Sequence, residues 1–349
     1  MRRACGWRPR APSAPAPSTE LETALLAAVS DTGALFLTEA TGVEVTLVDV
    51  SDVYRVATDG TSAAGTADTG LSGLSSAGAL VLRTLDGAIV LAAATAGQVT
   101  ATGNVLLAAG GTTSDLDVRS TVTSNGGNIS ASAGHDVLLG ATVYASVAGK
   151  TIDVVAGAAL VQSQGTRVST ASGNVSLAAV GDATLEAVLV GGTGTGIRVS
   201  AASIIDGDAA GDSEADLLAA SVQLIATGAV GAAGAQLETS ANTLAIDADG
   251  DVFVNNTAAV VFGNTTLNVA RVDAEGGTAL TTNALLTGLS GDDIVVRALT
   301  GNFTVNTGAP VAATGNLLLQ ATAGSSNMTL NAAATAAGAI SLPPPTTCC

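Results

Sequence analysis

The chain has 349 residues, 29 of them acidic and 12 basic, which gives a formal charge of −17. Hydrophobic residues make up 47 % and charged residues 12 %, the reverse of the composition of a disordered chain. Apolar runs such as Ala24–Val29 are far shorter than the roughly 18 residues that a membrane-spanning helix needs. One lysine and scattered arginines provide no basic face for nucleic acid. The composition therefore predicts a folded chain of small aliphatic residues with no membrane span and no nucleic-acid partner.

Both ends differ in composition from the rest of the chain. Residues 1–18 are rich in proline and arginine, and residues 343–349 read PPPTTCC. The arginines are not followed directly by the continuous apolar stretch of a signal peptide, so no signal peptide is assigned. The three cysteines, Cys5, Cys348 and Cys349, lie only in these ends. The body therefore cannot depend on internal disulfides or on cysteine-bound metal.

The body begins with the only stretch that has weak helical periodicity, Thr19–Ala28, where Thr19 and Glu22 are spaced as in a capping box. After it, a phrase of Gly-Asn and alternating apolar residues recurs. It reads GNVLLAA at 103, GNISASA at 127, KTIDVVA (a degenerate copy) at 150, GNVSLAA at 173, GNFTVNT at 301 and GNLLLQA at 315. A second phrase reads GHDVLLGA at 134, GDATLEA at 181 and GDVFV at 250. The alternation predicts short strands with one buried face, and the Gly, Asn and Asp residues predict turns between them.

The first phrase recurs at nearly constant spacing where it is best preserved, since its copies there begin at positions 103, 127, 150 and 173. An antiparallel sandwich does not require a fixed period, whereas parallel strands stacked coil upon coil do. The spacing therefore predicts an all-β, right-handed parallel β-helix with coils of about 23 residues, and roughly 13 coils in all. Its narrow interior suits Val, Leu, Ile and Ala and fits large aromatic residues poorly, while Gly and Asn should form columns at the corners.

These patterns predict three segments: a non-native or disordered leader at 1–18, a β-helix repeat domain at 19–342 and a disordered tail at 343–349. The Gly-Asn phrases followed by Gly-Asp resemble the repeat regions of large bacterial exoproteins similar to filamentous haemagglutinins. The stretch from Ser203 to Val254 resembles a unit of very long haemagglutinin-like surface proteins. The resemblance covers about residues 35–340. It implies an exported, elongated stalk or adhesive surface.

Some β-helix proteins cleave polysaccharides with clustered carboxylates and basic partners, so the chain could carry a catalytic site of this kind. The only histidine, His135, follows Gly134 as in polygalacturonases, but no accompanying Asn-Thr-Asp or Arg-Ile-Lys element is present, and Asp292 and Asp293 lie far downstream. In the repeat alignment His135 occupies a variable corner position. The sequence therefore predicts an exposed turn at His135 and no catalytic residues.

Calcium binding is the sharper possibility for a site. Five carboxylates lie close together in one short stretch: Asp206, Asp208, Asp212, Glu214 and Asp216. Against an EF-hand loop, Asp206 and Asp208 match positions 1 and 3, but Ala210 and Leu217 stand where oxygen ligands are required. A second, shorter run contains Asp247, Asp249 and Asp251. The alternative to a calcium site is an acidic loop that protrudes from one coil.

The preferred interpretation is a non-catalytic structural and adhesive rod, part of a larger secreted or surface-displayed bacterial repeat protein. It places the chain outside the cell or on its surface, associated with the outer membrane. Its expected partners are surface glycans or proteins of a host or neighbouring cell, and adjacent repeats of the same longer chain. No cofactor is predicted apart from calcium. The alternatives are a carbohydrate-active β-helix enzyme and a calcium-stabilised spacer.

Overall fold

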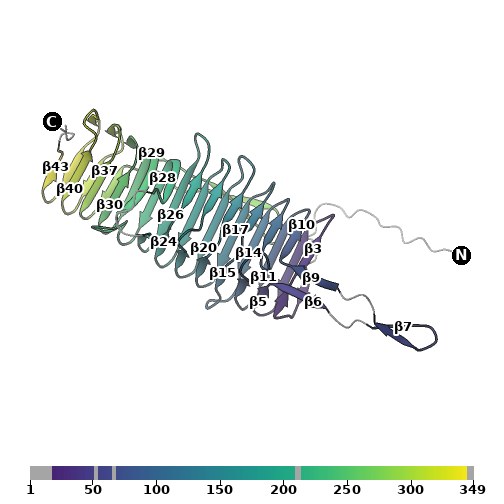
Figure 1. The fold of residues 1–349 in the computed structure, drawn as a ribbon. Helices are drawn as coiled ribbons and strands as arrows, with labels where there is room; N and C mark the ends of the chain where they lie inside the picture. The colour runs from purple at the N-terminus through teal and green to yellow at the C-terminus, as the bar shows by residue number, and fades with distance from the viewer. Residues whose placement is uncertain (1–17, 51–53, 65–67, 209–213, 344–349) are drawn as a thin grey trace.

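The computed structural model describes residues 18–50, 54–64, 68–208 and 214–343. Most of the predicted leader and tail, including all three cysteines, lies outside these ranges. The described residues contain no helix and form a parallel β-solenoid of about 13 turns with coils of about 23 residues, so the predicted fold is confirmed. Figure 1 shows the strands stacked as rungs of an elongated rod.

Each regular coil has three short strands, which lie on three faces named here A, B and C in chain order. Face A begins with β1 (Thr19–Leu21) and continues with β4 (Leu35–Glu39), β11 (Leu80–Thr84), β14 (Val105–Ala109), β17 (Ile129–Ala133), β20 (Ile152–Ala156), β23 (Val175–Ala179) and β26 (Gly196–Ala201). Face B contains β2 (Leu25–Leu26), β5 (Val43–Val45), β12 (Ile89–Leu91), β15 (Leu116–Val118), β18 (Val137–Leu139), β21 (Leu160–Gln162), β24 (Ala183–Leu185) and β27 (Ile204–Asp206). Face C contains β3 (Ala28–Ser30), β10 (Leu74–Ser76), β13 (Val99–Ala101), β16 (Val122–Ser124), β19 (Val143–Ala145), β22 (Val168–Thr170) and β25 (Val188–Val190).

The strands change length in the C-terminal third. The strands β28 (Leu217–Ala226) and β29 (Leu237–Ala248) run through the corner from face C to face A without a break. Beyond them three columns of parallel strands continue the solenoid. The first column is β30 (Val252–Asn256), β37 (Ile294–Ala298), β40 (Leu317–Ala321) and β43 (Ile340–Ser341); the second is β31 (Val260–Phe262), β38 (Phe303–Val305) and β41 (Met328–Leu330); the third is β36 (Leu289–Gly291), β39 (Val311–Ala313) and β42 (Ala334–Ala336).

The core is a stack of equivalent aliphatic side chains. Val105, Ile129, Ile152 and Val175 are consecutive partners in the face A ladder, and all four are fully buried. Each occupies the same place in its copy of the recurring phrase, so the stacking follows the repeat seen in the sequence. Two large aromatic residues nevertheless enter the core: Phe262 and Phe303 pair on β31 and β38, and their ring centroids are 5.2 Å apart. The interior thus accepts two aromatic rings from adjacent coils that contact each other at a tilted angle of 44°.

The corners are held by columns of polar side chains that join one coil to the next. Asn128 donates its backbone N–H to Asn104 Oδ1 at 2.8 Å, and Asn128 Oδ1 accepts the N–H of Thr151 at 2.9 Å. At the corner before face B, Asp115 Oδ1 accepts the N–H of Asp136 at 3.0 Å, and Asp136 Oδ1 accepts an N–H of the next coil at 2.8 Å. The recurring Asn and Asp residues therefore satisfy backbone donors that would otherwise be left without partners at the turns.

Two insertions interrupt the regular coils. The first contains the antiparallel pairs β6 (Leu47–Val50) with β9 (Asp68–Ser72), and β7 (Tyr54–Val56) with β8 (Ser62–Ala64). In Figure 1 the β7–β8 hairpin projects beyond the N-terminal end of the rod. The second contains β32 (Asn264–Thr265) with β35 (Leu286–Thr287), and β33 (Val269–Val272) with β34 (Thr278–Thr281).

The second insertion lies along the outer side of face A, visible in Figure 1 as a pale green strand behind the coils. Arg271 Nε donates to Asp153 Oδ2 at 2.6 Å, the N–H of Val272 donates to Ser130 Oγ at 2.8 Å, and Asn104 Nδ2 donates to the carbonyl of Gly276 at 2.8 Å. Val272 packs with the outward side chains of Val81 and Leu106. The insertion therefore fastens several coils of face A together.

The weak helix predicted at Thr19–Ala28 is wrong. This stretch forms β1, β2 and the start of β3, and β1 pairs in parallel with β4 at Thr19↔Leu37. A helix this short is marginal without packing on its apolar face, whereas here each short strand gains backbone hydrogen bonds from the adjoining coil. Tertiary pairing overrides the local periodicity.

We expect Leu107→Ala to destabilise the rod because Leu107 is fully buried between coils. Its truncation leaves a cavity and should lower the free energy of unfolding by about 2–5 kcal/mol. Urea unfolding followed by far-UV circular dichroism measures the effect. The control is Leu85→Ala, since Leu85 is 59 % exposed and its loss should change the urea midpoint little. Equal losses for the two variants would contradict the assigned core.

Candidate functional site

An acidic corner lies where the chain passes from face B to face C near the middle of the rod. Asp206 is the last residue of β27, Asp216 precedes β28, and Glu238 is the second residue of β29, one coil further along. One carboxylate oxygen from each of these three residues lies within 4.8 Å of the others. We call Asp206, Asp216 and Glu238 the acidic corner; its donors are of the type that hard divalent cations prefer.

Asp216 is the most confined member of the acidic corner. It is 1 % exposed, and its Oδ2 accepts the N–H of Glu238 at 2.8 Å. Its Oδ1 is buried and has no hydrogen-bond partner among the described residues. The pKa of Asp216 is raised to about 9, chiefly by burial and in part by the charges of Asp206, Glu238 and Asp208, against the lowering effect of the Glu238 N–H. The ionised form of this carboxyl therefore needs a compensating positive charge.

Glu238 is almost as deeply placed as Asp216. It is 4 % exposed, and its Oε1 accepts a hydrogen bond of 3.2 Å from Asn255 Nδ2. Asn255 is its ladder partner on β30 and has a buried Oδ1 that lacks a hydrogen-bond partner. Oxygen atoms from three successive coils thus collect at one corner.

The structure brings together two of the five carboxylates predicted to bind calcium, Asp206 and Asp216. Asp208 donates its backbone N–H to Asp206 Oδ1 at 2.8 Å, while the exposed Glu214 borders a groove on face C. Asp212 lies outside the described residues. Glu238 was not predicted from the sequence, although it follows Asp216 by 22 residues, close to one coil length, and that spacing was the available signal.

Three other carboxylates of the predicted acidic runs form hydrogen bonds between coils: Asp247, Asp251 and Asp293. Asp251 Oδ1 accepts the N–H of Asp293 at 3.1 Å, and Asp293 Oδ1 accepts the N–H of Asn316 at 2.6 Å. Asp247 Oδ1 accepts the hydroxyl of Ser290 at 2.6 Å. Hydrogen bonds between coils account for these carboxylates.

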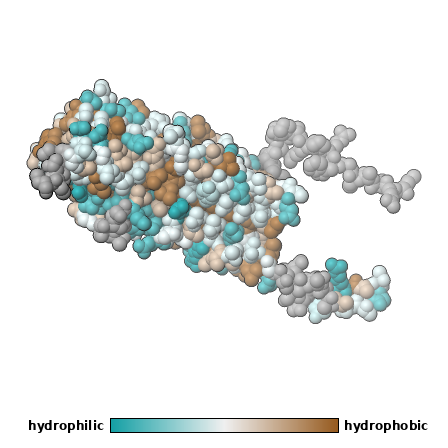
Figure 2. All heavy atoms as spheres, turned by 45° about the horizontal axis from the view of Figure 1, so that its top comes forward, coloured by the Kyte–Doolittle hydropathy of each residue, from teal (hydrophilic) through white to brown (hydrophobic). Residues whose placement is uncertain are grey.

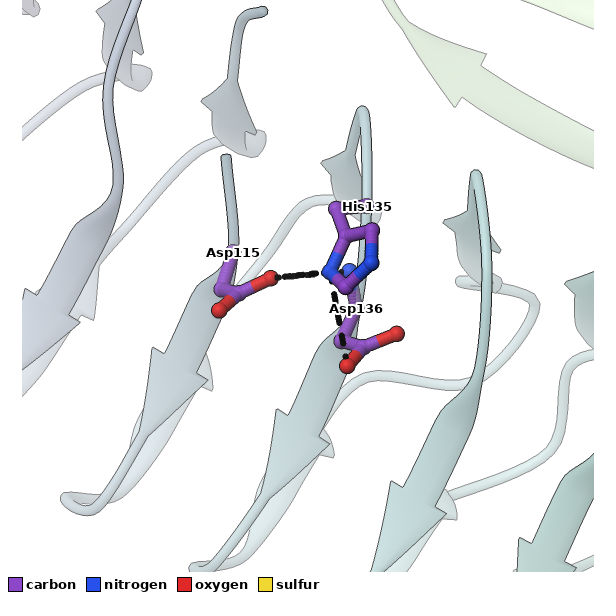
Figure 3. Close-up of side chains that lie close together, drawn as sticks. All are labelled: Asp115, His135 and Asp136. Carbon is purple, nitrogen blue, oxygen red and sulfur yellow. Dashed lines mark hydrogen bonds and ion pairs between the residues drawn. The ribbon is translucent and has the colours of Figure 1, made fainter. Parts of the chain in front are cut away.

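His135 lies in the bend before β18, as predicted for an exposed turn (Figure 3). Its Nδ1 lies 2.8 Å from Asp115 Oδ1 and 3.4 Å from Asp136 Oδ2, and 46 % of its side chain is exposed. The hydrogen bond to Asp115 raises the pKa of His135 above 6.5, with a smaller contribution from Asp136. The imidazole therefore partly neutralises two carboxylates that the column places in neighbouring coils.

A groove of about 690 Å³ on face C was not predicted from the sequence. It runs over β19, β22 and β25 and is lined by Tyr144, Arg167, Ser169, Glu186, Leu189 and Glu214, among others. Tyr144, Ser169 and Leu189 are ladder partners whose side chains face outward. Glu186 Oε1 accepts the N–H of Gly165 at 2.8 Å, and its Oε2 is buried without a partner. An aromatic ring, a guanidinium and two carboxylates thus share one open surface, which we call the Tyr144 groove.

Comparison with known proteins leaves the family open. No protein-family model matches the chain, and no curated protein or solved structure matches it. The resemblance to haemagglutinin-like repeats therefore stays a prediction. Within the described ranges, no helix combines the length and the apolar character needed to cross a bilayer.

We expect the His135 imidazole to titrate above pH 6.5 in the folded protein because Asp115 accepts its hydrogen bond when it is protonated. Its contribution to stability is fully present below the pKa of the unfolded chain and is lost as the pH rises through the folded pKa. NMR can follow the titration directly, since the chain contains a single histidine. Asp115→Asn should move the midpoint down towards 6.5, and an unchanged midpoint would contradict the assigned partner.

Proposed function

We propose that this chain is a non-catalytic structural and adhesive rod of a secreted or surface-displayed repeat protein. The fold supports this role, because stacked coils hold side chains at a fixed spacing along an extended surface. The core needs no bound group to close it, since each coil packs on the next. The working surface is then the outward residues of the faces and the two insertions.

The observation that carries the adhesive role is the Tyr144 groove. Tyr144, Arg167 and Glu186 come from three successive coils and border the same open surface. A tyrosine ring offers an apolar face to the C–H side of a sugar, while guanidinium and carboxylate groups form hydrogen bonds with hydroxyls. We therefore propose that the Tyr144 groove binds a segment of a surface glycan laid along the rod.

The C-terminal end of the rod supports an axial partner. On the last described coil Leu330 and Ile340 are 38 % and 48 % exposed, although their ladder partners Val305 and Leu317 are buried. Figure 2 shows apolar residues mixed with polar ones along the length of one face, including its ends. Parallel β-strands of other solenoid coils are the partners whose backbone and side chains would fit such an edge.

We expect Tyr144→Ala to weaken glycan binding roughly ten-fold or more, as for loss of an aromatic anchor worth at least about 1.4 kcal/mol. A glycan array followed by calorimetry with the best ligand measures the change. Tyr54→Ala is the matched control, because Tyr54 is an exposed tyrosine on the separate β7 hairpin. If no glycan binds, or if both variants bind like the parent protein, the adhesive role of the groove is wrong.

A carbohydrate-active enzyme is the second candidate, favoured by one observation. Glu186 and Glu214 border the same groove as Arg167. Enzymes of this class use a pair of carboxyl groups, and a basic side chain beside them can bind an acidic sugar. Incubation with acidic and neutral polysaccharides should then release new reducing or unsaturated ends, and Glu186→Gln should lower that release by at least roughly 100-fold. Under the preferred proposal, the parent protein releases no ends from any glycan it binds.

A further inference from the structure

The acidic corner has a feature that the corner columns do not need. In the columns, Asp115, Asp136 and Asp293 accept backbone N–H groups at partly exposed positions. Asp216 does the same with Oδ2, yet its other oxygen is buried and without a hydrogen-bond partner, beside the carboxylates of Asp206 and Glu238.

We propose that Asp206, Asp216 and Glu238 bind a calcium ion that joins the end of β27 to the starts of β28 and β29. The ligand atoms within 4.8 Å of one another fit one ion, because two oxygens on opposite sides of Ca²⁺ at about 2.4 Å are separated by about 4.8 Å. The buried Asp216 Oδ1 is the oxygen that no hydrogen bond uses, so it is free to make this bond.

Charge compensation is the physical reason for the ion. An ionised carboxylate loses several kcal/mol of solvation on burial unless it is paired, hydrogen-bonded or bound to metal. In the part of the chain that the structure describes, the charged groups that act on Asp216 are Asp206, Glu238 and Asp208, and all are acidic. A divalent cation bound between the three carboxylates would attract all of them and so offset their mutual repulsion.

The donor chemistry selects calcium among the common metals. The donors are carboxylate oxygens, with the amide of Asn255 held beside Glu238, and they include no sulfur or imidazole of the kind that zinc prefers. Ca²⁺ accepts six to eight oxygens in flexible geometry, whereas Mg²⁺ demands a near-ideal octahedron at about 2.0–2.1 Å. Asp206 and Asp216 lie at the two ends of the segment between β27 and β28, and Glu238 lies in the next coil. Ligands from such separate positions suit Ca²⁺, which tolerates irregular geometry.

The test is calcium titration of the whole chain after chelator treatment, by calorimetry and by thermal melting. We expect saturable binding of one Ca²⁺, a higher melting temperature with calcium, and a much weaker response to Mg²⁺ at the same concentration. Asp216→Asn keeps an oxygen for the Glu238 N–H but removes the charge. This variant and Glu238→Gln should each lower calcium affinity roughly ten-fold or more.

The matched control is Asp182→Asn, because Asp182 accepts the N–H of Ser203 in a corner column but lies outside the acidic corner. It should bind calcium like the parent chain. If Asp216→Asn does not fold, the less buried Asp206→Asn replaces it. Absence of binding at millimolar calcium, or undiminished binding in the corner variants, would overturn the proposal. If the parent chain does not bind calcium and Asp216→Asn has a higher melting temperature than the parent, the charge of Asp216 is removed by protonation and not by a metal ion.

Discussion

Parallel hydrogen bonding between coils is the constraint on which the rest of this molecule depends. A single coil of about 23 residues cannot enclose a core, so each side chain packs mainly on its counterpart one coil away. Strands in register lie about 4.8 Å apart, which brings equivalent side chains into direct contact. Val, Ile and Leu gain from such repetition, as at Ile129 and Ile152, and so do Asn side chains that bond to the next backbone.

The same constraint explains why the fold was predictable. The nearly constant spacing of the recurring phrase fixes the register, and the alternation within GNVLLAA fixes which side chains face inward. The insertion at residues 264–287 departs from the regular coils, although it begins within GNTTLNV at 263, a degenerate copy of the recurring phrase. Its position depends on contacts such as Arg271 with Asp153, which are 118 residues apart, and on apolar packing of Val272. No local periodicity specifies contacts of that kind.

The acidic corner was likewise predictable only in part, because the sequence indicates two of its residues and the stacking of coils adds the third. A local density of carboxylates in the sequence indicates Asp206 and Asp216, which lie between the end of β27 and the start of β28. Glu238 joins them through the register of β28 with β29, which pairs Leu217 with Thr239. The Tyr144 groove was missed for a related reason: Tyr144 and Glu186 lie two coils apart, and only stacking places them on one surface.

Stacking also places acidic side chains of neighbouring coils close to one another. A carboxylate in one coil lies within a few ångströms of an acidic counterpart in the next, and hydrogen bonds or basic side chains offset the repulsion between them. Asp115 and Asp136 have His135 between them (Figure 3), and the buried Asp153 has Arg271 from the second insertion. Among the described residues, the charged groups that act on Asp216 are carboxylates, and its Oδ1 has no hydrogen bond. At Asp216 a proton or the proposed calcium ion would supply the compensation that hydrogen bonds and basic side chains give at the other carboxylates.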